Sequence, residues 1–273
     1  MTGTKAGTVL IAYADGPSSP RVAPDDVLTA AGLCGPCEVL LGLTVERHGW
    51  LDDPTLRGRT FLPGYALSRA VANGRLQPLS IRLSAVPSMI VERPPDIGVI
   101  TVVRRGDGYA FSGSVGWGDV LARHATRLVL EVDECAHDFG GPTIEGNVVA
   151  VVARPGHATT PVGQRAADDV DLTIGALVAS LVPDGATLQF GPGGIGEGIA
   201  RGLDRPVSIR SGLLTDAMAE LSDRGLLAAP AVAAYTWGGE PIARLADAGE
   251  LRLTSITETN DSSQIAAIPR FVA

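Results

Sequence analysis

The stretch TLQFGPGGIG at residues 187–196 joins an apolar strand to a helix through a loop built mainly of glycine. Residues 186–190 have the short apolar pattern of a buried strand, residues 191–198 are rich in glycine, and residues 195–202 read as a short helix. The spacing matches G-x-G-x-x-G in the context of a strand, a turn and a helix. Such a loop lets an anion approach backbone N–H groups at a helix start, so the stretch predicts a β–loop–α unit with an anion-binding loop.

Three interpretations of this loop are open. The glycines could serve only the tight packing of strand against helix, or the loop could contact an anionic thioester ligand. A nucleotide site of an NADP-dependent oxidoreductase is the third, since Arg210 at the end of the next strand could meet a 2′-phosphate. Against a nicotinamide site, no acidic residue follows that strand to hold a ribose hydroxyl, and Pro192 lacks an N–H donor.

The rest of the chain alternates between strand and helix patterns. Short Val-, Ile- and Leu-rich segments are typical of parallel strands covered on both faces. We expect further strands at residues 8–14, 38–45, 96–104, 127–132, 207–210 and 251–257, and helices at residues 24–32, 65–73, 115–126, 164–181 and 215–224. Residues 154–163 read as a loop, and residues 226–250 are poorly defined. The pattern predicts an α/β fold with an open, mainly parallel sheet and helices on both faces, followed by the start of a second α/β domain.

Composition narrows the class of protein. The chain has 273 residues, 45% hydrophobic and 4% aromatic residues, and a net charge of −8. That charge disfavours nucleic acid and anionic membrane surfaces as partners. No segment has the length of an apolar membrane span, and the first residues lack a leader pattern, so we expect a soluble cytoplasmic protein.

Cysteine and histidine give weaker signals. The motif CGPC at residues 34–37 lies between a predicted helix and a predicted strand, the reverse of a thioredoxin-like site, so we interpret it as a structural turn. His137 and Asp138 could contact a polar substrate or form a surface pair, whereas His48, His124 and His157 show no metal-ligand spacing. We predict no metal site.

Several linked segments resemble the acetyl-CoA hydrolase/4-hydroxybutyrate CoA-transferase family. Residues 187–199 are similar to the family segment "LQ-x-G-x-G-G-I-x-x-A-I/V", and residues 208–216, SIRSGLLTD, resemble "I-H-S/T-E/G-M-I/F-S/T-D" at the right distance. Residues 61–91, 96–99, 131–133, 259–261 and 271–273 resemble further family segments. The sequence departs from the family after Val132, where ECAHDFGG replaces the usual "M-P-R-T-x-G".

The resemblance implies the fold and the chemistry. Residues 1–228 would form an amino-terminal CoA-transferase-like domain, and residues 229–273 a connection and the incomplete start of a second domain. The family nucleophile is a Glu in the motif "T-E-x-G-V-A", which this chain lacks. Glu258 shares only "T-E" with that motif, so we do not assign it as the nucleophile. We expect the catalytic Glu in an absent second half. Coenzyme A would be a substrate, and no permanently bound cofactor is expected.

The resemblance also implies site residues and partners. The substrate- and CoA-binding candidates are Gln189, Gly191, Gly193, Gly194, Gly196 and Ser211. Asp216 is a further candidate, with a cap of the helix predicted at residues 215–224 or a solvated turn as its other interpretations. The expected partners are a short-chain acyl-CoA, a carboxylate, and either a second CoA-transferase-like half or further copies of the chain. A non-catalytic paralogue that binds acyl-CoA or a subunit is the alternative.

Overall fold

The computed structural model describes residues 7–154 and 166–273. The chain divides into two compact units. Unit 1 comprises Met1–Asp138 and Pro142–Ala158, and unit 2 comprises Phe139–Gly141 and Thr159–Ala273. Most of the loop predicted at residues 154–163, together with His157, lies outside the described residues.

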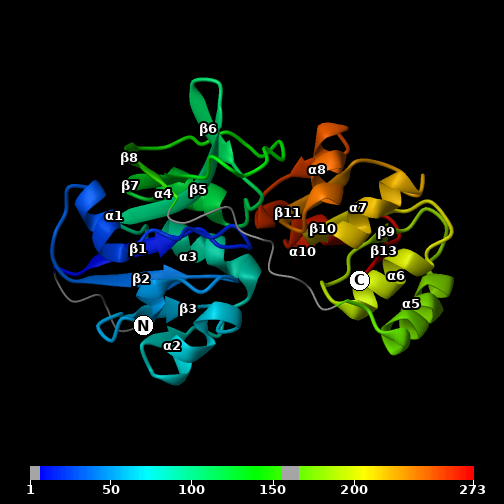
Figure 1. Ribbon diagram of the computed structural model, residues 1–273, viewed down its shortest axis with the longest axis horizontal. Coiled ribbons are helices and arrows are strands. Elements are labelled where there is room, and N and C mark those ends of the chain that lie inside the picture. The colour runs from blue at the N-terminus through cyan, green and yellow to red at the C-terminus, as the bar shows by residue number, and fades with distance from the viewer. Residues whose placement is uncertain (1–6, 155–165) are drawn as a thin grey trace. The chain divides into compact units, whose positions relative to one another are not determined.

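Unit 1 contains an eight-stranded sheet (Figure 1). Its strands are β1 (Val9–Tyr13), β2 (Cys37–Leu41), β3 (Gly58–Thr60), β4 (Leu76–Pro78), β5 (Ile97–Arg105), β6 (Gly108–Phe111), β7 (Arg127–Val132) and β8 (Val148–Ala153). The order is β4-β3-β2-β1-β5-β7-β8, with every neighbouring pair parallel, and β6 adds an antiparallel hairpin to β5.

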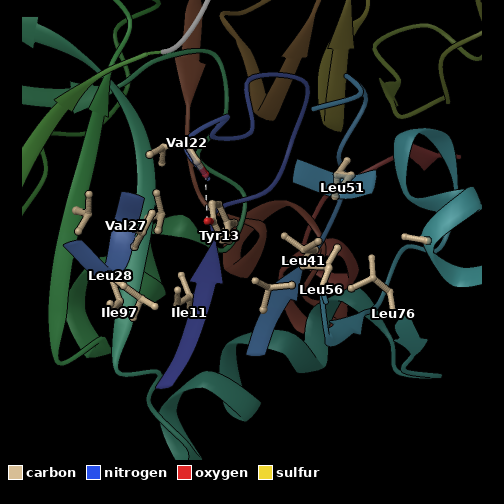
Figure 2. Packing of buried hydrophobic residues seen from close by; sticks show 14 of the residues in the cluster. Ile11, Tyr13, Val22, Val27, Leu28, Leu41, Leu51, Leu56, Leu76 and Ile97 are labelled. Carbon is tan, nitrogen blue, oxygen red and sulfur yellow. Dashed lines mark hydrogen bonds between the residues drawn. The ribbon is translucent and has the colours of Figure 1, made fainter. Parts of the chain in front are cut away.

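Helices cover both faces of this sheet. They are α1 (Pro24–Ala30), α2 (Ser68–Ala72), α3 (Val86–Glu92) and α4 (Gly118–His124), with short 3-10 turns η1 (Gly49–Asp52), η2 (Tyr65–Leu67) and η3 (Leu83–Ala85). Ile97 and Val99 of β5 join Val27 and Leu28 of α1 in one buried cluster, shown in Figure 2. A side chain at Gly98, on the opposite face, would meet Leu121 and Ala125 around α4. Because neighbouring strand residues point to opposite faces, α1 and α4 cover different sides of the sheet.

Unit 2 contains a five-stranded sheet in which all pairs are parallel. Its strands are β9 (Thr187–Leu188), β10 (Ser208–Thr215), β11 (Ala231–Trp237), β12 (Leu251–Leu253) and β13 (Phe271–Val272), in the order β12-β11-β10-β9-β13. The helices are α5 (Asp169–Leu181), α6 (Gly194–Gly202), α7 (Asp216–Asp223), α8 (Glu240–Asp247), α9 (Ile256–Thr259) and α10 (Ser262–Ala266). The structure thus has the mainly parallel α/β class that the sequence predicts.

The domain division differs from the expected one. Residue 228, where the sequence suggested a boundary, lies inside unit 2, between strands β10 and β11. These two strands pair over their whole shared length, from Arg210 opposite Val232 to Thr215 opposite Trp237. Parallel pairing therefore joins both sides of residue 228 into one sheet. The residues expected to begin a second domain supply β11, β12 and β13 to it.

The bounds of some predicted elements differ from those of the observed helices and strands. The poorly defined residues 226–250 contain strand β11 and helix α8, because the Ala-rich segment AVAAYTW becomes a strand through its pairing with β10 and β12. The helix predicted at residues 164–181 begins at Asp169, where Asp168 and Asp171 form a reciprocal capping box. The helix predicted at residues 65–73 is split into η2 and α2.

Candidate functional site

The glycine-rich loop lies at a topological switch point of unit 2. Successive strands β9, β10, β11 and β12 progress to one side of the sheet, whereas β13 returns to pair with β9 on the other side. In open parallel sheets, ligands bind outside the carboxyl ends of the strands where the order reverses. Residues 189–196 directly follow β9 at this place, so topology and sequence motif point to the same segment.

Two glycines of the loop are required by its backbone. Gly193 is the N-cap of α6 and has φ 123° and ψ 176°, a conformation essentially restricted to glycine. A Cβ atom at Gly196 would lie 2.3 Å from the carbonyl oxygen of Gly191, so a side chain there would force the loop apart. Gly194 is buried at the first position of α6. Gly193 and Gly196 therefore shape the turn itself, as the packing interpretation requires.

Gly191 is different. No atom lies within 4 Å of a Cβ built at this position, the residue is exposed, and its backbone φ is not in the positive region. Neither folding strain nor internal packing accounts for a glycine at Gly191. The open space beside it is where a ligand could approach the backbone N–H groups at the start of α6, which carry the positive end of the helix dipole.

Gln189 connects this loop to β13. Its backbone N–H donates to the carbonyl oxygen of Val272 at 2.9 Å. Its side-chain Oε1 is buried and has no hydrogen-bond partner among the described residues. An unpaired buried acceptor beside an open loop is a feature that a bound donor group would satisfy.

Ser211 lies on the neighbouring strand but is enclosed. It is 1% exposed, in the middle of β10, and pairs with Ala233. The structure therefore brings Gln189 and Gly191, Gly193, Gly194 and Gly196 into one segment, and leaves Ser211 within the sheet. Gly212, where the resembled segment has Glu or Gly, has the side chain of Asn260 beside it: a Cβ would lie 3.2 Å from Oδ1.

Asp216 has a structural partner. The N-cap of α7 is Thr215, not Asp216. The Asp216 carboxylate accepts hydrogen bonds from the backbone N–H of Gly239, at 2.9 Å to Oδ1 and 3.1 Å to Oδ2, and Gly239 is the N-cap of α8. Burial raises the pKa of this carboxyl, and the bond from Gly239 opposes the rise. Asp216 thus ties α7 to the start of α8.

Glu258 is held by two arginines. Its carboxylate accepts from Arg210 at 3.0 Å, from Arg252, and from the Thr254 hydroxyl at 2.7 Å. The hydrogen bond from Arg252 is the main reason that the pKa of Glu258 falls to about 2. A carboxylate so strongly stabilised as an anion is a weak nucleophile.

Unit 1 contains a buried charged cluster around Glu131 that the sequence patterns did not predict. Glu131 is 0% exposed and accepts hydrogen bonds from the backbone N–H groups of Arg21 and Val22 and from Arg154 Nη1, at 2.8, 2.6 and 2.7 Å. Arg154 also lies 3.2 Å from Asp133, and Arg21 donates to Glu46 at 2.7 Å. Glu131 within the apolar strand RLVLEV was the sequence signal for this cluster, because a charged side chain is rarely buried without a partner.

His48 lies beside this cluster. It is 7% exposed, stacks on Trp50 with ring centroids 5.9 Å apart, and its Nε2 has no hydrogen-bond partner among the described residues. Burial, helped by the charges of Arg154 and Arg21, lowers the pKa of His48 to about 4. The ring is therefore neutral at pH 7.

The geometry of the described residues gives little support to a redox site at CGPC, a substrate contact at Asp138 or a metal site. The CGPC motif is a turn that ends where β2 begins at Cys37, and burial and nearby Asp25 raise the pKa of that thiol, which disfavours a reactive thiolate. Asp138 accepts a hydrogen bond from Arg105 at 2.7 Å. In the described part of the chain, His, Cys, Asp and Glu form no group of three or more that could hold a metal ion. No helix of that part has the length and apolarity to cross a membrane.

Comparison with known proteins shows the fold class and one sequence relative. Over 97% of its length the chain shares the fold of a 4-hydroxybutyrate CoA-transferase from Porphyromonas gingivalis (TM-score 0.70, 18% identity, 67% of that chain) and of RipA from Yersinia pestis (TM-score 0.77, 19% identity, 68% of that chain). The α subunit of a malonate decarboxylase from Acinetobacter baumannii is similar over 84% of this chain and 48% of that one, with TM-score 0.54 and 14% identity. The fold is thus that of CoA-transferase-like α/β proteins.

A sequence match is more specific. A 4-hydroxybutyrate coenzyme A transferase from Clostridium kluyveri is 28% identical over 165 residues, which cover 58% of this chain and 38% of that protein. The match and the fold support membership of the acetyl-CoA hydrolase/CoA-transferase family, as the sequence motifs indicate. No family model matches the sequence. The alignment spans well under two thirds of the Clostridium protein.

Proposed function

We propose that this chain is a component of an acyl-CoA:carboxylate CoA-transferase or an acetyl-CoA hydrolase that acts on a short-chain acyl-CoA. The observation that carries the proposal is the loop at residues 189–196. It lies at the β9/β13 switch point, leaves open space beside Gly191, and belongs to a fold shared with CoA-transferases. Coenzyme A is a substrate in this proposal and not a resident cofactor.

In the proposed reaction a glutamate carboxylate attacks the thioester carbonyl, which gives an acyl anhydride and releases CoA thiolate. The thiolate then attacks the glutamyl carbonyl, which gives a glutamyl-CoA thioester and frees the first carboxylate product. An acceptor carboxylate completes transfer by the reverse sequence, or water completes hydrolysis. We assign the nucleophile to no residue of this chain, and a second CoA-transferase-like half would supply it.

In this proposal the residues of the chain bind the thioester ligand and stabilise its negative charge. The backbone N–H groups at the start of α6 would face the anionic thioester ligand, with Gly191, Gly193, Gly194 and Gly196 allowing its close approach. The unpaired Gln189 Oε1 would accept a hydrogen bond from the ligand. Ser211, buried in β10, would act by positioning the loop rather than by direct contact. We place the activity in the cytoplasm.

A non-catalytic paralogue that binds acyl-CoA or a subunit is the second candidate. Glu258, the carboxylate next to the resembled segments, is held by Arg210 and Arg252 and is not the nucleophile in either candidate. An NADP-dependent oxidoreductase is disfavoured by the same contact, because Arg210, the residue that would meet a 2′-phosphate, is paired with Glu258.

Acetyl-CoA binding, measured by isothermal titration calorimetry, tests the loop. The variant Gly191→Leu introduces a side chain that meets no protein atom near its Cβ, so the fold should be kept while affinity falls about tenfold or more, or 1.4 kcal/mol. Gly64→Leu is the matched control, since a Cβ at Gly64 in unit 1 also meets no atom within 4 Å and the extended backbone of Gly64 accepts a side chain. Equal affinities for both variants would rule out ligand contact at Gly191.

Exchange of labelled acetate into acetyl-CoA separates the candidates. The proposal expects exchange only when a chain carrying the second half is added. Binding of acetyl-CoA without exchange under any pairing supports the non-catalytic paralogue. Binding of NADPH but not of CoA would support the oxidoreductase.

A further inference from the structure

A positively charged hollow lies in unit 1, at the edge opposite the carboxyl ends of the strands. It has a volume of about 640 Å³ and is lined by Arg57, Arg69 and Arg75 together with Asp52 and Asn73. Arg57 directly precedes β3 and Arg75 directly precedes β4, and the two strands are parallel neighbours. The order of the chain therefore places two of the three guanidinium groups at the amino ends of adjacent strands.

Two of the arginines are anchored by one nitrogen each. Arg57 Nη1 donates to the carbonyl oxygens of Pro54 and Leu56, at 2.8 and 2.7 Å. Arg75 Nη1 donates to the carbonyl oxygens of Leu51 and Asp53, at 2.6 and 2.9 Å. The remaining N–H groups of both side chains have no hydrogen-bond partner among the described residues. The carbonyl oxygens of residues 51–56 thus hold both guanidinium groups in place, and their remaining N–H groups can donate to another acceptor.

The charge of the hollow favours an anion. Three arginines and one aspartate give a net charge of +2 (3 minus 1) in a chain whose total is −8. The Asp52 carboxylate is occupied mainly by Arg47, at 2.7 Å, while Arg69 Nη1 is 3.6 Å from it, beyond hydrogen-bond distance. Arg69 therefore has no short partner of its own in this hollow.

We propose that this hollow binds the phosphoryl group of a small molecule. Guanidinium forks match the oxygens of phosphate, and several of them lining one hollow suit a dianion better than a single carboxylate. The volume fits a metabolite, and the net charge of the chain disfavours a nucleic acid. The site rests on unit 1 residues alone and does not depend on the proposed reaction.

Calorimetric titration with inorganic pyrophosphate tests the site, at an ionic strength of about 0.05 M, where surface charges are weakly screened. Arg69→Gln should weaken binding about tenfold, because it removes a charged donor that holds no backbone group. Asp52→Asn should tighten binding, because it removes the only carboxylate from the lining. Arg93→Gln, at an exposed arginine outside the lining, is the matched control and should leave affinity within about twofold.

The two variants of the hollow are expected to change pyrophosphate affinity in opposite directions, with Arg69→Gln weakening it and Asp52→Asn strengthening it. Absence of saturable pyrophosphate binding by the unmodified chain would overturn the proposal. So would equal weakening by Arg69→Gln and Arg93→Gln, since that result would mean diffuse attraction to positive charge anywhere on the surface. Circular dichroism of each variant checks that the exposed substitutions leave the fold unchanged.

Discussion

The sheets of the two units share a strand order but differ in what lies at their carboxyl edges. In unit 1 the order β4-β3-β2-β1-β5 reverses between β1 and β5, and in unit 2 the order β12-β11-β10-β9-β13 reverses in the same way between β9 and β13. At the carboxyl edge of unit 1, Glu131 accepts hydrogen bonds from Arg154 and from Arg21 and Val22 in the loop after β1. That of unit 2 carries a loop with open space beside Gly191.

The difference shows that topology alone does not make a binding site. A switch point creates a crevice, but the side chains that follow the strands decide whether the protein fills it. In unit 1, Glu131 accepts hydrogen bonds from two backbone N–H groups of the loop after β1, those of Arg21 and Val22. In unit 2, the loop before α6 has open space beside Gly191, where we propose that an anion binds. We therefore interpret the edge of unit 1 as structural and that of unit 2 as functional.

The largest expected effect comes from breaking the buried cluster. Glu131→Gln should lower the free energy of unfolding by about 3 kcal/mol or more, because it leaves the buried Arg154 guanidinium without its main counter-charge. Urea denaturation followed by tryptophan fluorescence measures the loss, since Trp50 and Trp117 both lie in unit 1.

The control for this variant is Glu134→Gln. Glu134 forms an ion pair with Arg104 in which both side chains are more than half exposed, so its loss should cost under about 1 kcal/mol. A cost for Glu131→Gln no larger than the control would mean that the cluster does not hold the edge of unit 1.

A smaller effect should appear as pH dependence from His48. Its pKa is about 4 in the folded chain, below the ordinary value of 6.5, so the unfolded chain binds the proton more tightly. The stability from the neutral ring is therefore present above pH 6.5 and is lost as pH falls toward 4. Between pH 7 and pH 5 the loss should be about 2 kcal/mol.

The variant His48→Phe isolates this contribution. It keeps an aromatic ring against Trp50 and cannot titrate, so the part of the pH dependence due to His48 should vanish in urea titrations at the two pH values. His124→Phe, at an exposed histidine, should retain it. An unchanged slope in His48→Phe would show that the ring is accessible to protons in the folded chain.

The sequence predicted the features that are local. The strand, loop and helix at residues 187–202 follow from an apolar run and from glycines whose backbone or packing needs them, such as Gly193 and Gly196. The core strands β5 and β7 were found because Val- and Ile-rich segments buried on both faces have no other common explanation.

Features that depend on pairing between distant segments were missed. The two-residue strand β13 is recognisable only through its ladder with β9, and β11 has an alanine-rich sequence that becomes a strand by lying between β10 and β12. For the same reason the sequence could not show that residues 229–273 complete the sheet of β9 and β10. The role of Arg154 likewise depends on Glu131, 23 residues earlier in the chain.

Hydrogen–deuterium exchange of the chain with and without acetyl-CoA tests most directly whether the edge of unit 2, and not that of unit 1, is the functional one. We expect slowed exchange in peptides covering residues 189–199, with no change in peptides covering residues 15–22 and 128–133. Protection at the edge of unit 1 without protection of the glycine-rich loop would contradict this expectation.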